Sequence, residues 1–136
     1  MRGAPMRITL DFVDGAVRGS ALTPALSGGP LTIALPVPAG TVDDNAVLPL
    51  LTIMRWRADL DIAFPVLLSG KGTVVTHRVR VLGPDSTTVP AGHFDTWRVE
   101  LVGGDAPLVM HFERAAPNRL IRMQPGAAPF DVQRVR

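Results

Sequence analysis

Residues 87–122, TTVPAGHFDTWRVELVGGDAPLVMHFERAAPNRLIR, decide the fold of this chain. They contain a Pro-Ala-Gly corner, a strand, a Gly-Gly-Asp turn, a second strand, a short loop and a third strand. The apolar side chains of this meander fall on one face, which collects Trp97, Val99, Leu101, Leu108, Met110, Phe112 and Ile121. The other face collects Arg98, Glu100, His111, Glu113 and Arg122. Alternation with a period of two predicts an antiparallel sheet with one dry face and one wet face.

Pairing across the turns of this meander gives its expected register. A loop at residues 104–105 pairs Trp97 with Phe112, and it places Arg98 opposite His111. The loop at 115–118 then brings Ile121 onto Phe112 and Met123 onto Met110. Both loops keep the apolar residues on one side.

An N-terminal hairpin is predicted by the dipeptide at residues 14–15, Asp-Gly, which accepts the positive φ angles of a type I′ turn. The register that follows pairs Phe12 with Val17 on one face and Asp11 with Arg18 on the other. A slip of one residue would mix apolar and charged side chains, so the register is well specified.

A second hairpin is predicted around residues 69–72, Ser-Gly-Lys-Gly. It pairs Phe64 with His77 on the apolar face and Asp61 with Arg80 on the other. A turn at residues 83–85, Gly-Pro-Asp, is then expected to lead into the meander.

Residues 43–56, DDNAVLPLLTIMRW, are the one helical candidate. Asp43, Asp44 and Asn45 suit a helix N-terminus. Because Pro49 cannot occupy a regular helix interior, we expect a short turn followed by a helix over residues 48–56. This apolar helix is expected to fill the concave side of the sheet.

Two further strands are expected near sheet edges. Residues 31–37 place four apolar side chains on one face, but Pro36 and Pro38 cannot donate to a ladder, so this strand should lie at an edge or end there. Residues 130–135 form a last strand that closes the sheet or extends its edge.

These registers agree on a mainly β fold: a single curved antiparallel sheet of hairpins, a half-barrel or an open barrel, with one short helix packed on the concave face. About seven to nine strands are expected. A chain of 136 residues suits one β-rich domain, 1–136, in which residues 43–56 are a helical insertion between strands.

Composition excludes several classes of function. The chain has no cysteine, which rules out disulfides, thiolate metal sites and cysteine catalysis. Its arginines are scattered among acids, unlike a nucleic-acid footprint. No 18-residue apolar segment is present, so no transmembrane segment is expected. The first ten residues lack the apolar run of a signal peptide, so an exported parent would need a leader upstream.

The three histidines do not predict a metal site. His77 should point inward and His111 outward, while His93 lies in the corner, so the three cannot share an ion. His111 is interpreted as a solvated neighbour of Arg98 and Glu113. His77 is either a core histidine bonded to backbone or water, or a polar anchor inside an apolar pocket. No serine has a histidine and an acid at matching positions, so no catalytic residue, metal or cofactor is assigned.

The chain also resembles a bacterial family of unknown function, over roughly its last two thirds. The resemblance rests on a Val-Pro-Ala-Gly-x-Phe-x-Thr corner and a Pro-x-Arg-Leu closing turn, matched here by Val89, Pro90, Ala91, Gly92, Phe94, Thr96, Trp97, Pro117, Arg119 and Leu120. That family is similar to the lipoprotein carriers of the LolA/LolB type, which are curved half-barrels with helices across an apolar concave face. The resemblance implies a location in the cell envelope or periplasm, and it implies no catalytic residues.

The leading hypothesis is a non-catalytic binding domain, not an enzyme, that holds an apolar or lipid-like ligand in the concave face. The candidate pocket lining is Phe64, His77, Trp97, Val99, Met110, Phe112 and Ile121. The alternative is a scaffold or accessory subunit that binds no ligand and docks on a larger protein assembly, in solution or at a membrane. If the helix and the aromatic side chains fill the concavity, the second hypothesis gains.

Overall fold

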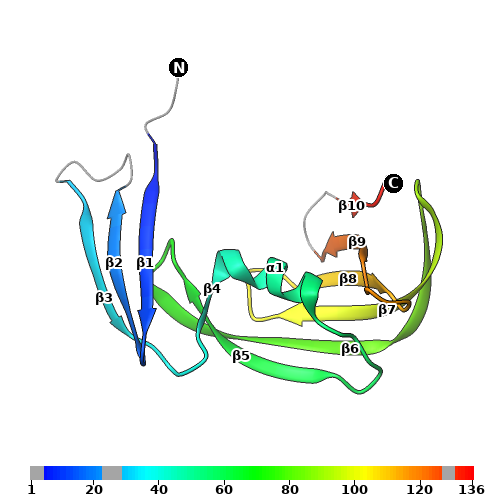
Figure 1. Ribbon diagram of the computed structural model, residues 1–136, viewed down its shortest axis with the longest axis horizontal. Helices are drawn as coiled ribbons and strands as arrows, with labels where there is room; N and C mark the ends of the chain where they lie inside the picture. Colours follow the sequence, from blue (N-terminus) through cyan, green and yellow to red (C-terminus); the bar gives the residue numbers. More distant parts are fainter. Residues whose placement is uncertain (1–4, 23–28, 127–130) are drawn as a thin grey trace.

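A computed structural model describes residues 5–22, 29–126 and 131–136 of the chain (Figure 1). Its strands form two sheets. The small sheet contains, in spatial order, β1 (Arg7–Val13), β2 (Ala16–Leu22) and β3 (Leu31–Pro36). The large sheet has the order β10-β9-β8-β7-β6-β5-β4. Its strands are β4 (Val42–Asp43), β5 (Asp61–Leu68), β6 (Thr73–Val89), β7 (Gly92–Val102), β8 (Leu108–Glu113), β9 (Leu120–Pro125) and β10 (Val132–Gln133).

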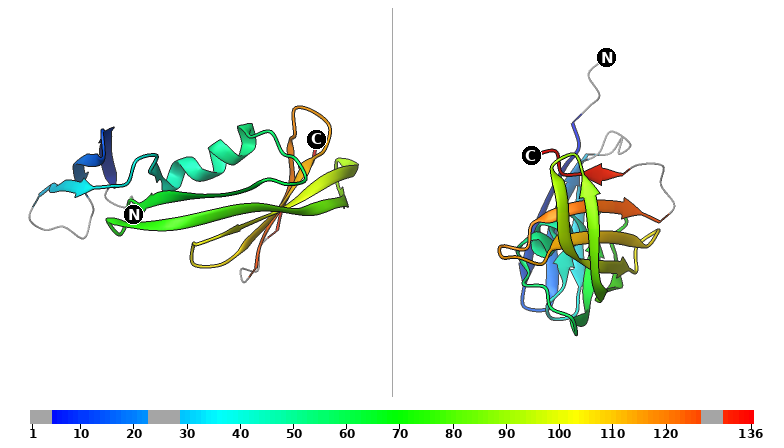
Figure 2. Two further views of the ribbon diagram at one scale, coloured as in Figure 1. Left: turned by 90° about the horizontal axis from the view of Figure 1, so that it is seen from below. Right: turned by 90° about the vertical axis from the view of Figure 1, so that its right-hand side faces the viewer.

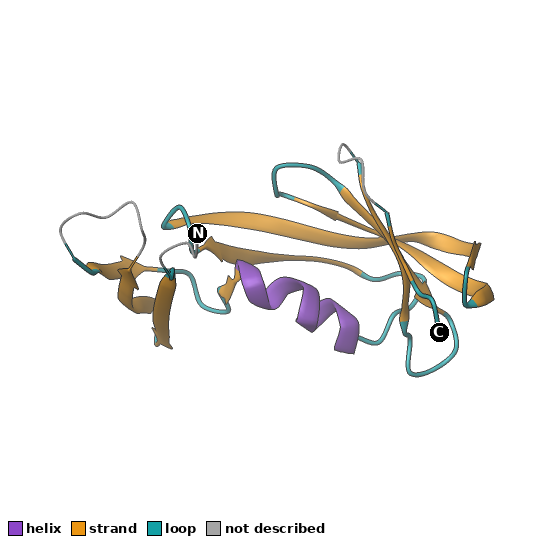
Figure 3. Ribbon diagram, turned by 90° about the horizontal axis from the view of Figure 1, so that it is seen from above, coloured by secondary structure: helices purple, strands orange, loops and turns teal. Residues whose placement is uncertain are grey.

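The large sheet curls into a half-barrel, and α1 (Asp44–Ile53) lies along its inner side (Figures 1 and 2). The helix runs beside the long β5–β6 hairpin, and the small sheet lies beyond the end where the helix begins (Figure 3). The predicted fold class, mainly β with a curved half-barrel and one short helix, is confirmed. The first three strands form a sheet of their own instead of extending the half-barrel.

The predicted hairpin registers are confirmed. Phe12 pairs with Val17 in the small sheet, Phe64 pairs with His77 between β5 and β6, and Trp97 pairs with Phe112 between β7 and β8. Asp14 and Gly15 both have positive φ, as a type I′ turn requires. The sequence therefore encoded these pairings locally, through turn chemistry and alternation.

The turn predicted at residues 83–85 is wrong, because β6 continues through them to Val89. The register with β7 shifts between Val81 and Gly83, so Leu82 is the extra residue of a β-bulge. Gly83 has a φ of 142°, which few other residues adopt. Pro84 is tolerated because β5 begins at Asp61, opposite Arg80, so that among the described strands this part of β6 pairs with β7 alone.

The chain reverses instead at residues 90–91 of the predicted corner, where Val89 pairs with Gly92. A second irregularity lies in β9, where the register shifts and Leu120, not Ile121, pairs with Phe112. The prediction for Ile121 was therefore wrong by one residue, while Met123 pairs with Met110 as predicted.

The helix begins earlier than predicted, at Asp44, and ends at Ile53. Asp43 is its N-cap, and its Oδ1 accepts a hydrogen bond of 2.9 Å from the backbone N–H of Asn45. Pro49 lies inside the helix, contrary to the prediction, on the exposed side, where water can reach the carbonyl left without a donor. Val47 and Leu51, one turn apart, anchor the helix in the core on either side of the proline.

The two expected edge strands are present in shortened form. The strand β3 lies at the edge of the small sheet, and β10, of two residues, lies at the edge of the large sheet against β9. Residue 130, the predicted start of the last strand, lies outside the described residues.

Candidate functional site

The centre of the concave face is occupied by the protein itself. Val99, Met110 and Phe112 have no exposed surface and belong to one core cluster with Val47 and Leu51 of α1. Trp56, just after the helix, stacks on Phe112 with ring centroids 4.6 Å apart and an interplanar angle of 27°. These residues therefore offer no surface to a ligand in this conformation.

The other predicted lining residues are dispersed. Phe64 and Trp97 are half-buried at opposite ends of the concave face, and His77 is buried beside Phe64. Ile121 is buried at the β9 irregularity, outside the core cluster that contains Phe112. The predicted lining thus separates into a filled centre and two ends, each of which has a cavity.

The corner cavity, of about 750 Å³, lies at the end of the concave face where the helix ends. It is formed by the α1–β5 connection, the start of β7 and the end of β8, with lining residues Trp56, Arg57, Ala58, His93, Phe94, Asp95, Trp97, Glu113, Arg114 and Ala115. The Arg114 guanidinium lies 4.9 Å from the centre of the Trp97 ring, a cation–π contact. The corner motif therefore brings aromatic and charged groups to one open cavity.

Glu113, one of the two acids that line the corner cavity, is held ionised by an arginine. Glu113 accepts hydrogen bonds from Arg119 Nε at 2.7 Å and Nη2 at 3.1 Å, and these bonds hold the pKa of Glu113 below its ordinary value. Nearby, Thr88 Oγ1 and His93 Nδ1 are 3.0 Å apart on the exposed β6–β7 hairpin. The hydrogen bonds found in the described part of the chain give His93 no carboxylate partner.

The hairpin cavity, of about 550 Å³, lies at the opposite end, where the helix begins. It is formed by the β5–β6 and β7–β8 loops and the first turn of α1, with lining residues Asp44, Leu68, Gly70, Lys71, Thr73, Val75, His77, Gly103, Gly104 and Asp105. Lys71 Nζ and Asp105 Oδ1, one from each loop, are 3.5 Å apart. The first turn of the helix is fixed to the β5–β6 loop by a 2.8 Å hydrogen bond from Ser69 Oγ to Asp44 Oδ1.

His77 lies in this cavity with only 7% of its surface exposed, and neither ring nitrogen has a hydrogen-bond partner. Burial lowers the pKa of His77, and the negative charge of Asp44 opposes that shift in part, so the ring is neutral near pH 7. Sequence reasoning placed His77 on the inner face correctly. It missed that the β7–β8 loop approaches His77 closely. The signal in the sequence was the glycine pair Gly103-Gly104, which leaves room for that approach.

His111 points to the outer face, as predicted, but it is not solvated: only 8% of its surface is exposed. Its neighbours across the sheet are Arg98 on β7 and Arg122 on β9, whose long side chains can cover a residue between them. Burial lowers its pKa, and Asp85 Oδ2, 4.0 Å from Nδ1, opposes the shift. The described residues contain no cluster of three metal-ligating side chains, so the histidines remain separate.

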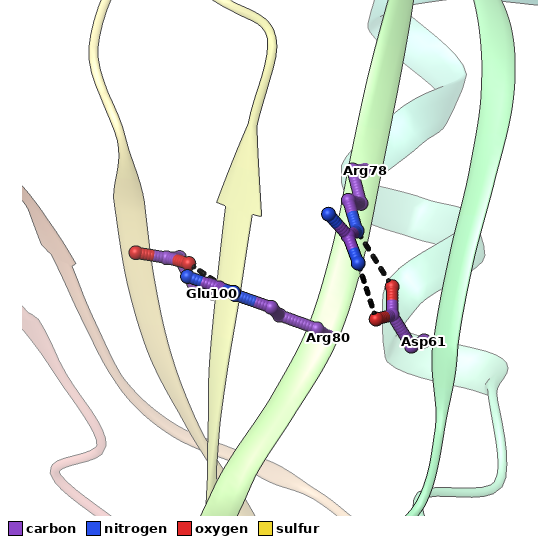
Figure 4. A network of polar contacts seen from close by, with 4 residues as sticks. All are labelled: Asp61, Arg78, Arg80 and Glu100. Carbon is purple, nitrogen blue, oxygen red and sulfur yellow. Dashed lines mark hydrogen bonds and ion pairs between the residues drawn. The ribbon is translucent and has the colours of Figure 1, made fainter.

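The outer face of the half-barrel carries paired charges. Asp61 and Arg80 are backbone partners as predicted, but the Asp61 carboxylate binds Arg78 at 2.8 and 2.6 Å, while Arg80 Nε reaches Glu100 at 2.7 Å (Figure 4). The hydrogen bond from Arg78 holds the pKa of Asp61 below its ordinary value. These exposed pairs form a solvated charged surface and contribute little to stability.

Apolar side chains are also exposed outside the half-barrel. Met6 and Phe12 are 66% and 41% exposed, and with Ile8 and Leu10 they line a crevice. Its far side is formed by Asp43 and Asn45 at the start of the helix and by Ser69 in the β5–β6 loop. We call this the apolar crevice, and its volume is about 330 Å³. On the helix itself, Ile53 is 77% exposed.

Comparison of the chain with protein-family models, with curated proteins and with solved structures gave no significant match. The described helix, of ten residues, is too short to cross a bilayer.

Proposed function

We propose that this protein is a non-catalytic docking domain, which binds an apolar segment of a partner protein in the apolar crevice. The observation that supports this proposal is the filled concave face. The helix and Trp56 take up the centre of the half-barrel, while apolar side chains remain exposed on β1 and on the outer side of α1.

The crevice has the composition of a protein-binding surface. Its wall is apolar through Met6, Ile8, Leu10 and Phe12, and its far rim is polar through the first residues of the helix. The β1 strand is also an edge strand within the described sheets, so its outer backbone groups are open to an added strand. A partner segment that is apolar and extended would use both features.

In the test, the parent protein and two variants are each purified from the native host, and native mass spectrometry then shows what each of them retains. The parent is expected to retain one protein at fixed stoichiometry, and Met6→Asp, which puts a charge on the crevice wall, is expected to lose it. Thr9→Asp, on the opposite face of the same strand, is the matched control and should retain the partner. Loss in both variants, or a parent that carries lipid and no protein, would contradict the proposal.

The alternative, a carrier of a lipid-like ligand in the concave face, requires α1 and Trp56 to move away from Phe112. A fluorescent fatty acid that binds saturably at micromolar concentration, and is blocked by Val99→Trp, would favour this alternative. The resemblance to the envelope family, and the location it implies, remain predictions.

A further inference from the structure

We propose that the hairpin cavity is a binding site for a small organic ammonium compound with a short apolar chain. The site is separate from the apolar crevice, so neither proposal depends on the other.

The first argument is the unsatisfied imidazole. A histidine that is 93% buried normally has at least one hydrogen-bond partner, because burying an unpaired polar group costs stability. Both ring nitrogens of His77 lack a partner in the protein, and the ring lines an open cavity. Both nitrogens are covered in this structure, so a ligand that donates a hydrogen bond would satisfy the acceptor nitrogen of the neutral imidazole once the ring turns toward the cavity.

The second argument is charge. Lys71 and Asp105 are paired with each other at 3.5 Å, which leaves the Asp44 carboxylate as the uncompensated charge of the lining. The helix N-terminus adds about half a positive charge, which is less than the full negative charge of the Asp44 carboxylate. The Asp44 carboxylate and the neutral imidazole are both acceptors for an ammonium group, which has only donors.

The third argument is shape and polarity. Leu68 and Val75 supply an apolar wall, which suits a short alkyl chain, and the volume of about 550 Å³ lies within the ordinary range for small-molecule sites. Gly103 keeps the β7–β8 loop against the strand that carries His77, because a Cβ there would lie 2.2 Å from the Thr76 carbonyl oxygen. Two hairpin loops and a helix end therefore build the walls from different parts of the chain.

The test is a titration of the intact protein with n-butylammonium chloride at constant ionic strength, followed by NMR. The His77 ring and the Gly103 and Gly104 amides are expected to shift saturably, with a dissociation constant in the millimolar range. n-Butanol and butyrate are the matched neutral and anionic probes, and each should bind at least about tenfold more weakly. A bound ammonium group also disfavours imidazolium, so the pKa of His77 should fall further in its presence.

Two variants separate recognition from folding. Asp44→Asn removes the charge and keeps the shape, and it should weaken butylammonium binding about tenfold or more. Asp59→Asn, at an exposed acid paired with Arg57 after the helix, is the control and should leave binding unchanged. If Asp44→Asn disturbs the helix, Val75→Trp provides a second route, because it fills the cavity and should abolish the shifts.

The proposal is overturned if no saturable shift occurs up to about 50 mM, which identifies a cavity that holds water only. Equal or tighter binding of butyrate overturns the ammonium assignment. Unchanged binding in both Asp44→Asn and Val75→Trp shows that the probe binds elsewhere.

Discussion

At the scale of single residues, the two buried histidines show that the face of the sheet on which a side chain lies does not decide how exposed it is. Alternation placed His77 inward and His111 outward, and both assignments hold. Burial does not follow from facing, because His111 is enclosed by neighbours on adjacent strands while Asp61, also on the outer face, stays exposed. Neighbouring side chains from distant parts of the sequence decide this difference.

Aspartate substitutions at the two histidines should separate their environments. His77→Asp buries a carboxylate beside Asp44, and the lysine of that cavity, Lys71, is already paired with Asp105, so we expect a loss of at least about 3 kcal/mol in unfolding free energy. His111→Asp should cost less, because Arg98 and Arg122 flank it. His77→Leu should be tolerated. Urea denaturation measures all three, and a larger loss for His111→Asp would show that the described packing is wrong.

The histidines also predict how stability depends on pH. Both have pKa values lowered by burial from the ordinary 6.5, so the unfolded chain binds protons more readily than the folded one. Their contribution is complete above pH 6.5 and is lost as the pH falls from 6.5 through the folded-state pKa values. Thermal melts between pH 7.5 and pH 5 should show a falling midpoint, and His77→Leu should reduce the slope. An identical slope in His77→Leu and the parent would contradict the burial of His77.

The β7–β8 loop offers a matched glycine pair. Gly103 has a φ of 109° and no space for a Cβ, so Gly103→Ala should cost more than about 2 kcal/mol. At Gly104 the nearest atom, His77 Nε2, is 3.9 Å from an added Cβ, so Gly104→Ala should change stability by less than about 1 kcal/mol. Equal effects in denaturant titrations would argue against the described loop.

At the scale of elements, turns and alternating strands were predictable and irregularities were not. Asp14-Gly15 and the Gly-rich loops fixed their hairpins locally. The β6 bulge could not be read in advance, because a Gly-Pro-Asp sequence suits a turn equally well, and only the length of β7 shows that the strand continues. The division into two sheets depends on contacts far apart in the chain, and so does the position of Trp56 on Phe112.

The helix provides a direct test between the sequence prediction and the structure. If α1 begins at Asp44, Pro49 lies in its interior, and Pro49→Ala restores a backbone hydrogen bond and should stabilise the protein by about 1–3 kcal/mol. If the helix began at Leu48, Pro49 would be in its first turn and the substitution would gain little. Circular dichroism and thermal melts of the variant distinguish the two, with no gain in stability favouring the later start.

At the scale of the whole molecule, helix α1 fills the concave face of the half-barrel. Val99, Met110 and Phe112, which were predicted to line a pocket, pack instead in one cluster with α1 and Trp56. A cavity at each end of the helix and the apolar crevice beside the small sheet are open. Function is therefore proposed at these margins and not at the centre.

Tryptophan fluorescence tests whether the centre of the concave face is filled. The chain has only two tryptophans, so Trp97→Phe leaves Trp56 as the sole emitter. Its side chain is 6% exposed and stacked on Phe112, so its emission should be blue-shifted from that of free tryptophan and resist quenching by acrylamide. Adding a fatty acid should leave both properties unchanged. Strong quenching of Trp56 in the folded protein, or a red shift when fatty acid is added, would show that the concave face is open to ligand.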